Sequence, residues 1–189
     1  VNDVQTAGGF IDAKEAATLG NSCGRHAMPG VALKVYLGDR SVDSFYGQAL
    51  ELIAEHRRAL RSGIEFVQKN GVEEKNSFYF FDAGNVIQDS LVGIIAGMLY
   101  GSVIDENKPI IALARNEDGT IKVSGRGTST LIRRGLNLGL AFKELGNKME
   151  GVEGGGHAIA AGCKVPGESL DEFLKELNTV LSAQLSIKE

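Results

Sequence analysis

Three consecutive glycines followed by a histidine are the feature of this sequence that most directly suggests chemistry. Gly154, Gly155 and Gly156 lead into His157 and then into small residues that end at Gly162. Glycine suits helix interiors poorly, at a cost of about 1 kcal/mol relative to alanine. The pattern predicts a loop whose successive N–H groups bind an anion. A helix that begins near His157 would add its positive end, with the imidazole as a further donor. The alternative is a glycine-rich turn that carries a buried histidine.

A basic segment precedes this loop. Residues 122–148 include six basic side chains and one acidic side chain, whereas residues 149–189 include seven acids and three lysines. Arg126 can present two N–H groups to one phosphate. Ser124 lies two residues earlier on the same expected strand, so both side chains point to one face. This distribution of charge favours an anionic ligand. For Arg126 alone, a surface ion pair is the alternative.

Side chains that hold catalytic metal ions are not grouped in the sequence. Phosphodiester hydrolysis usually needs metal ions held by clustered carboxylates and histidines. No Asp-x-Asp or Asp-His-His occurs, and none of His26, His56 and His157 has a carboxylate at ligand spacing. Cys23 and Cys163 form no Cys-x-x-Cys pair. The sequence therefore predicts neither a catalytic residue nor a metal ligand in this chain.

Three stretches together resemble one family. Residues 154–162 are similar to the Gly-Gly-Gly-His-x-x-Ala-Ala-Gly signature of the DHH-associated domain, the C-terminal domain of DHH phosphoesterases. Residues 124–126 resemble the Ser-Gly-Arg element of that domain. Residues 21–25 resemble the Asn-Ala-x-Gly-Arg segment between the two domains of RecJ-like proteins. Taken in their order along the chain, the three stretches resemble the C-terminal half of an archaeal RecJ-like single-strand-specific exonuclease.

The resemblance implies a role in gripping substrate. It implies that Ser124 and Arg126 hold a 5′ phosphate of single-stranded DNA or RNA in a 5′-to-3′ exonuclease. It also implies that the three glycines and His157 contact the phosphate backbone, and that Arg25 extends the groove. The family keeps its manganese or magnesium in an N-terminal DHH domain, which we expect as a partner of this chain. We expect these 189 residues alone to hydrolyse nothing.

Two alternatives stay open. Archaeal RecJ-like proteins are similar to a replisome component that binds the GINS complex, so residues 1–75 could dock a GINS subunit. The glycine signature also occurs in phosphatases that act on short oligonucleotides or nucleotides.

The expected fold class is α/β, with a mixed sheet of about four to five strands flanked by helices and preceded by a helical linker piece. We expect domains over 1–75 and 76–189. The composition, 43% hydrophobic with a net charge of −4, is that of a globular protein. No apolar run approaches the roughly 18 residues of a membrane span, so we expect a cytoplasmic protein without a membrane partner. The expected helices cover 12–20, 29–37, 43–70, 90–100, 131–148 and 169 onward; the expected strands cover 78–82, 108–115, 120–124 and the end of 158–166, and 150–156 is expected as a loop.

Overall fold

The structure is a computed structural model that describes residues 12–186 of the 189-residue chain. Contacts divide the chain into two compact units, Val1–Arg61 and Ser62–Glu189. The division falls within helix α3 (Phe45–Asn70), which contributes residues to both units. The boundary expected after residue 75 stays a prediction. Over the described residues, every helix is too short or too polar to cross a bilayer.

The first unit contains α1 (Ala13–Arg25), α2 (Pro29–Tyr36) and the first part of α3. Asp12 caps α1 by accepting a hydrogen bond from the N–H of Lys14, at 2.9 Å. The expected interruption at 21–25 is wrong, because α1 continues to Arg25 and the chain turns only at Ala27, where φ is 56°. A small apolar core holds the unit together, formed by Leu19, Cys23, Val31, Ala32, Val35, Tyr46, Ala49 and Leu52.

The second unit is built on a mixed sheet with the strand order β1-β2-β3-β4-β6-β5. The strands are β1 (Glu73–Glu74), β2 (Tyr79–Asp82), β3 (Ile110–Arg115), β4 (Thr120–Arg126), β5 (Glu153–Gly156) and β6 (Ala160–Pro166). β2 and β3 are parallel, and the other neighbours are antiparallel. The α/β class is confirmed. The sheet has six strands rather than four to five, because two short edge strands, β1 and β5, extend it.

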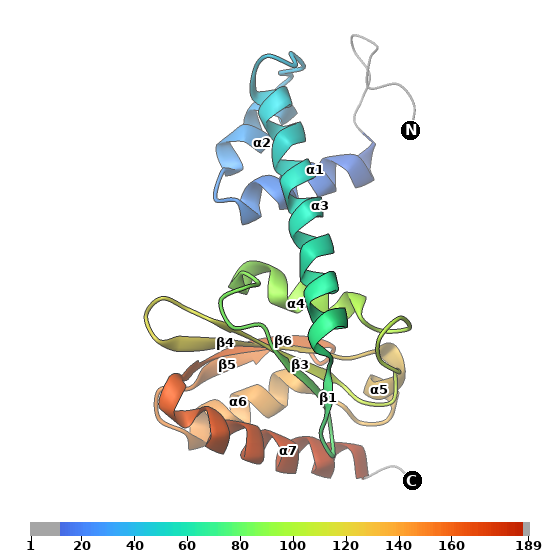
Figure 1. Cartoon of the computed structure of the whole chain (residues 1–189), viewed down its shortest axis with the longest axis vertical. Coiled ribbons are helices and arrows are strands. Elements are labelled where there is room, and N and C mark those ends of the chain that lie inside the picture. Colours follow the sequence, from blue (N-terminus) through green and yellow to red (C-terminus); the bar gives the residue numbers. More distant parts are fainter. Residues whose placement is uncertain (1–11, 187–189) are drawn as a thin grey trace. The chain divides into compact units, whose positions relative to one another are not determined.

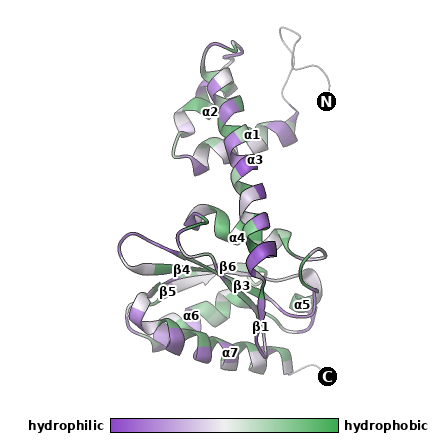
Figure 2. Cartoon of the chain, viewed as in Figure 1, coloured by the Kyte–Doolittle hydropathy of each residue, from purple (hydrophilic) through white to green (hydrophobic). Residues whose placement is uncertain are grey.

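Helices cover the two faces of this sheet unequally (Figure 1). α4 (Asp89–Met98) packs against β3 and β4 on one face, whereas α6 (Leu138–Lys148) and α7 (Leu170–Ser186) lie on the other face. Figure 2 shows α4 as mainly hydrophobic, and α7 as a mixture of hydrophobic and hydrophilic residues. The core between the sheet and α6 and α7 includes Ile111, Leu113, Ile121, Val123, Phe142, Leu145, Cys163, Val165, Phe173 and Leu177.

The single helix expected over 131–148 is two helices. α5 (Ser129–Arg133) ends before Gly135, whose φ of 110° is left-handed, and α6 begins after Asn137. The side chain of Asn137 caps α6 by accepting from the N–H of Leu140, at 3.0 Å. A short 3₁₀ turn, Gly167–Ser169, precedes α7. The break at Gly135 lets α6 turn back across the sheet and reach β5 and β6.

Candidate anion-binding site

The three glycines form a strand, which corrects the expected loop. Gly154, Gly155 and Gly156 belong to β5, and in the ladder they lie opposite Cys163, Gly162 and Ala161 of β6. No helix begins at His157; the chain turns directly into β6. The expected nest of inward N–H groups, reinforced by a helix end, is therefore wrong for this segment.

Close packing explains why glycine is needed in this strand. A Cβ on Gly154 would lie 2.5 Å from Cys163 Cβ, and a Cβ on Gly139 of α6 would lie 2.3 Å from the carbonyl oxygen of Gly156. Gly156 also has a left-handed φ of 140°. These glycines let α6 lie directly on β5, so part of the motif serves packing.

His157 occupies a tight hairpin turn between β5 and β6. Its N–H donates to the carbonyl of Ala160 at 2.9 Å, and the N–H of Ala160 donates back at 3.3 Å. Two further bonds fix the turn: the N–H of Gly127 donates to Ile159, and the N–H of Leu138 donates to Ala158. The imidazole of His157 is exposed. The turn therefore holds this side chain in solvent at a fixed place beside the end of β4.

Ser124 and Arg126 lie on the same face of β4, beneath α4. A Cβ built on Gly93 would lie 2.4 Å from Arg126 Nη2 and 3.1 Å from Ser124 Oγ. Ser124 is buried. Arg126 is partly exposed, and its Nη1 donates to the carbonyl of Gly125 at 2.7 Å. The shared face expected from their spacing is present.

An uncovered strip of sheet continues from this pair. In the ladder, Ser124 lies opposite Gly162, and Gly162 lies opposite Gly155, so all three are on one face. A Cβ on Gly155 would meet nothing within 4 Å, and one on Gly162 would lie 3.4 Å from Nζ of Lys122. The strip has a floor of bare backbone bordered by a lysine and an arginine. This arrangement suits an extended anion better than a compact apolar ligand.

Arg25 belongs to the first unit, in the exposed last turn of α1. Its neighbours include two histidines: burial above all, together with the charges of Arg25 and His26, holds the pKa of His56 below its usual value. Nδ1 of His56 is buried without a hydrogen-bond partner, and Nδ1 of His26 lies 3.8 Å from a carboxylate oxygen of Glu55. Arg25 is therefore part of a basic cluster within the helical unit.

Sequence reasoning missed three residues that shape the site. Gly93 faces both Ser124 and Arg126, and Lys122 borders the strip. The hydroxyl of the partly buried Tyr100 lies 2.9 Å from the carbonyl oxygen of Arg126 and 3.1 Å from that of Lys108. It can donate its one hydrogen to either oxygen, which ties down the end of β4. Gly93 and Gly97 are four residues apart, a spacing that leaves space for close packing between α4 and the sheet. Nothing in the sequence indicated which side chain would fill that space.

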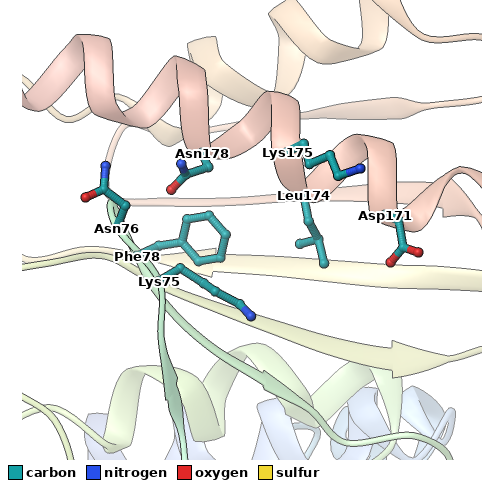
Figure 3. A pocket seen from close by; sticks show the side chains of 7 residues that line it. All are labelled: Lys75, Asn76, Phe78, Asp171, Leu174, Lys175 and Asn178. Atoms are coloured by element: carbon teal, nitrogen blue, oxygen red, sulfur yellow. The ribbon is translucent and has the colours of Figure 1, made fainter.

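A separate hollow lies against α7, on the other face of the sheet. Figure 3 shows Phe78 and Leu174 at its centre, with polar side chains around them. Asn178 lines this hollow, and its amide oxygen already accepts a hydrogen bond from the hydroxyl of Ser77, at 2.7 Å. None of the predicted site residues lines this hollow.

Metal binding does not fit the described residues. Between residues 12 and 186, no group of three or more histidine, cysteine, aspartate or glutamate side chains is arranged to hold a metal ion.

A mixed sheet with α4 on one face, α6 and α7 on the other, and a glycine strand at its edge defines the second unit as an α/β domain. The family model of the DHHA1 domain matches residues 77–183. The chain belongs to this family. The membership expected from the three motifs is thus confirmed, and it makes the chain a relative of DHH-family phosphoesterases.

Three proteins that are similar to this chain are longer than it is. An uncharacterized protein of Methanocaldococcus jannaschii, MJ0831, is 29% identical over 165 residues, which cover 87% of this chain and 34% of that protein. RecJ of Thermus thermophilus in complex with Mg²⁺ has a similar fold, with a TM-score of 0.69 at 16% identity over 90% of this chain and 25% of RecJ. CDC45 of Entamoeba histolytica has a TM-score of 0.60 at 14% identity, over 94% of this chain and 39% of that protein. The chain thus spans about a third of its curated relative, and the structural likenesses concern the fold.

Proposed function

We propose that this chain is the substrate-binding part of a DHH-family 5′-to-3′ exonuclease that acts on single-stranded nucleic acid. Ser124 and Arg126 hold the 5′ phosphate, and the strip beside them follows the phosphate backbone. His157 and the backbone of the glycine strand contact that backbone, and Arg25 adds a further basic contact from the helical unit.

The single observation that carries the proposal is the convergence of Ser124 and Arg126 beside an uncovered, glycine-floored strip. A guanidinium can form two parallel hydrogen bonds with one phosphate, and charge assistance makes them stronger than neutral bonds. Lys122 supplies a second positive charge along the same face. Bare backbone at Gly155 leaves room for a polymer to lie close to the sheet.

Catalysis belongs elsewhere in this proposal. Manganese or magnesium in a DHH domain supplies the chemistry that cleaves the phosphodiester bond, and the present residues hold the strand. The 189-residue chain should show no nuclease activity alone, whereas joining it to a DHH domain with manganese should give activity on single strands. A complete protein that cleaves no single strand under these conditions would overturn the proposal.

Fluorescence anisotropy with labelled single strands, 5′-phosphorylated or 5′-hydroxyl, tests the binding role directly. The wild-type chain should bind the phosphorylated strand about tenfold more tightly, the effect of one charge-assisted contact. Arg126→Ala should remove this preference. Arg115→Ala is the matched control, because Arg115 lies at the opposite end of the β3–β4 hairpin and pairs with Asp82 at 2.8 Å. Equal binding of both strands by the wild-type chain would contradict the proposal, and a dinucleotide that binds as tightly as a long strand would favour the phosphatase alternative.

A second candidate function is docking of a replisome protein, such as a GINS subunit, on the helical unit. The observation in its favour is a set of exposed apolar side chains: Leu33, Leu37 and Val42 are 57%, 75% and 69% exposed. Isolated exposed apolar residues are ordinary, but three within ten positions indicate a contact surface. Pull-down with a GINS subunit tests this. Binding that survives replacement of all three residues by serine would count against it.

A further inference from the structure

The side chain of Arg126 lies along α4 and passes two glycines of that helix, Gly97 and Gly93. A Cβ on Gly97 would lie 3.8 Å from Cγ and 3.9 Å from Cδ of Arg126, whereas a Cβ on Gly93 would meet its guanidinium at 2.4 Å. The two glycines are four residues apart, which is about one helical turn. The aliphatic part of Arg126 thus passes Gly97, and the charged end lies against Gly93.

We propose that Gly93 is a positioning residue for a terminal phosphate: by lacking a side chain, it sets where the Arg126 guanidinium lies. This inference rests on the proposed function and names the residue that gives that site its selectivity. Gly93 is buried on the face of α4 that packs on the sheet. Its ideal Cβ position also lies 3.1 Å from Ser124 Oγ, so one α-carbon adjoins both groups that the proposed function assigns to the phosphate.

Two contacts fix the guanidinium, and a third fixes the backbone of the same residue. Its Nη1 donates to the carbonyl of Gly125, its Nη2 lies against Gly93, and Tyr100 holds the carbonyl of Arg126 itself. An arginine side chain that is free to rotate loses rotamer entropy when it binds a ligand. Holding it in place beforehand reduces that loss and fixes the direction of its donors, which favours a phosphate at one place over a phosphate anywhere on the strand.

A methyl group at position 93 would displace the guanidinium of Arg126 and leave the fold intact. The atom it meets is the flexible end of a side chain, and alanine is the better helix former. At Gly97 the same methyl group makes only ordinary contacts with the stem of Arg126. Gly93→Ala and Gly97→Ala are therefore a matched pair on one helix that differ in their effect on the guanidinium.

The experiment measures anisotropy of 5′-phosphorylated and 5′-hydroxyl single strands with the 189-residue chain. Gly93→Ala should lose most of the roughly tenfold preference for the phosphorylated strand, as Arg126→Ala does, while Gly97→Ala keeps it. The affinity of Gly97→Ala for the 5′-hydroxyl strand should stay within about twofold of the wild-type value, because its contacts with the backbone remain. Circular dichroism melting should show the two glycine variants folded.

Two double variants separate positioning from a merely structural effect. In Gly93→Ala/Arg126→Ala, the second change should remove no further preference, because both act on one guanidinium. Gly93→Ala/Arg126→Lys lacks the collision, since lysine has no Nη2 atom, so it should fold and match Arg126→Lys. This second comparison serves as the test if Gly93→Ala alone does not fold.

The outcomes distinguish the two proposals. A wild-type chain without preference for the 5′ phosphate overturns the proposed function and this inference with it. A Gly93→Ala variant that keeps the wild-type preference, while Arg126→Ala loses it, overturns the positioning role alone. A Gly93→Ala/Arg126→Lys variant with less preference than Arg126→Lys would also overturn it, because Gly93 would then act through another group.

Discussion

The two faces of the sheet differ in how they are covered. On the α6 and α7 face, β4 contributes Ile121, Val123 and Gly125 to a continuous apolar core. On the other face, the same strand presents Lys122, Ser124 and Arg126, and α4 packs mainly on β3 and β4. The alternation of one strand thus places core residues on one face and polar side chains on the other. A face that is only partly covered is where a sheet can present polar groups without losing its core.

Charge follows the same division. α7, on the apolar-core side, carries the exposed acids Asp171 and Glu172, whereas Lys122 and Arg126 are on the α4 side. An acidic helix repels a phosphate backbone, and a basic strip attracts it. A nucleic acid strand is therefore expected on one face only.

Cysteine reactivity gives the largest expected difference between the faces. Burial raises the pKa of the Cys163 thiol to about 12, and the thiolate is the reactive form. In a Cys23→Ala background at about pH 8, alkylation of Cys163 should be about a thousandfold slower in the native protein than in urea. Because the pKa lies above this range, the native rate should still rise between about pH 7 and 9 without a plateau.

A thiol moved by one residue provides the control. In Cys23→Ala/Cys163→Ala/Lys164→Cys, the new thiol replaces an exposed side chain of β6 and should react at nearly the unfolded rate. Similar native rates at positions 163 and 164 would contradict the division of the sheet into a packed face and an open face.

Substitutions within the glycine strand give the next largest effect. Gly154→Ala places a methyl group against Cys163 and Phe142 on the core face, so the free energy of unfolding should fall by about 1–3 kcal/mol. Gly155→Ala points into open space and should change it by less than about 0.5 kcal/mol. Urea denaturation measures both.

The same pair separates packing from binding. Gly155→Ala narrows the open strip, so it should weaken single-strand binding while leaving stability nearly unchanged. Equal destabilisation by the two alanines would mean that β5 does not pair with β6 in the register described here.

The sequence predicted that Ser124 and Arg126 share one face of a strand, but it did not predict the structure of the glycine segment. Spacing alone placed Ser124 and Arg126 on one face, because side chains of a strand alternate. The three glycines led to the wrong prediction of a loop, because the low helix and strand propensity of glycine takes no account of packing against other elements. β5 exists because α6 approaches so closely that only glycine fits at Gly154 and Gly139, and such an approach is a tertiary property.

Two other differences have similar physical reasons. Gly135 was expected inside a helix, but its left-handed φ ends α5 and begins the turn into α6. The first helix was expected to end at residue 20, yet α1 continues through Gly24 to Arg25, because the buried neighbours Ser22 and Cys23 hold that turn against the small core. Neither the stop nor the continuation can be read from glycine alone, since packing decides between them.

Substitution of one lysine on each face gives the smallest expected effect on affinity. It also tests directly on which face a nucleic acid strand lies. Lys122→Gln on β4 and Lys175→Gln on α7 change the net charge equally, from −4 to −5. One lost phosphate contact should lower single-strand affinity by about two- to fivefold at low salt and reduce the salt-dependence slope by about 0.7. Lys122→Gln should show both changes. Lys175 is exposed beside Asp171 and Leu174 on the acidic helix, so Lys175→Gln should leave the slope unaltered.

Anisotropy titrations at several salt concentrations provide the slopes. A larger slope change at Lys175 than at Lys122 would place the nucleic acid on the α7 face and reverse the comparison.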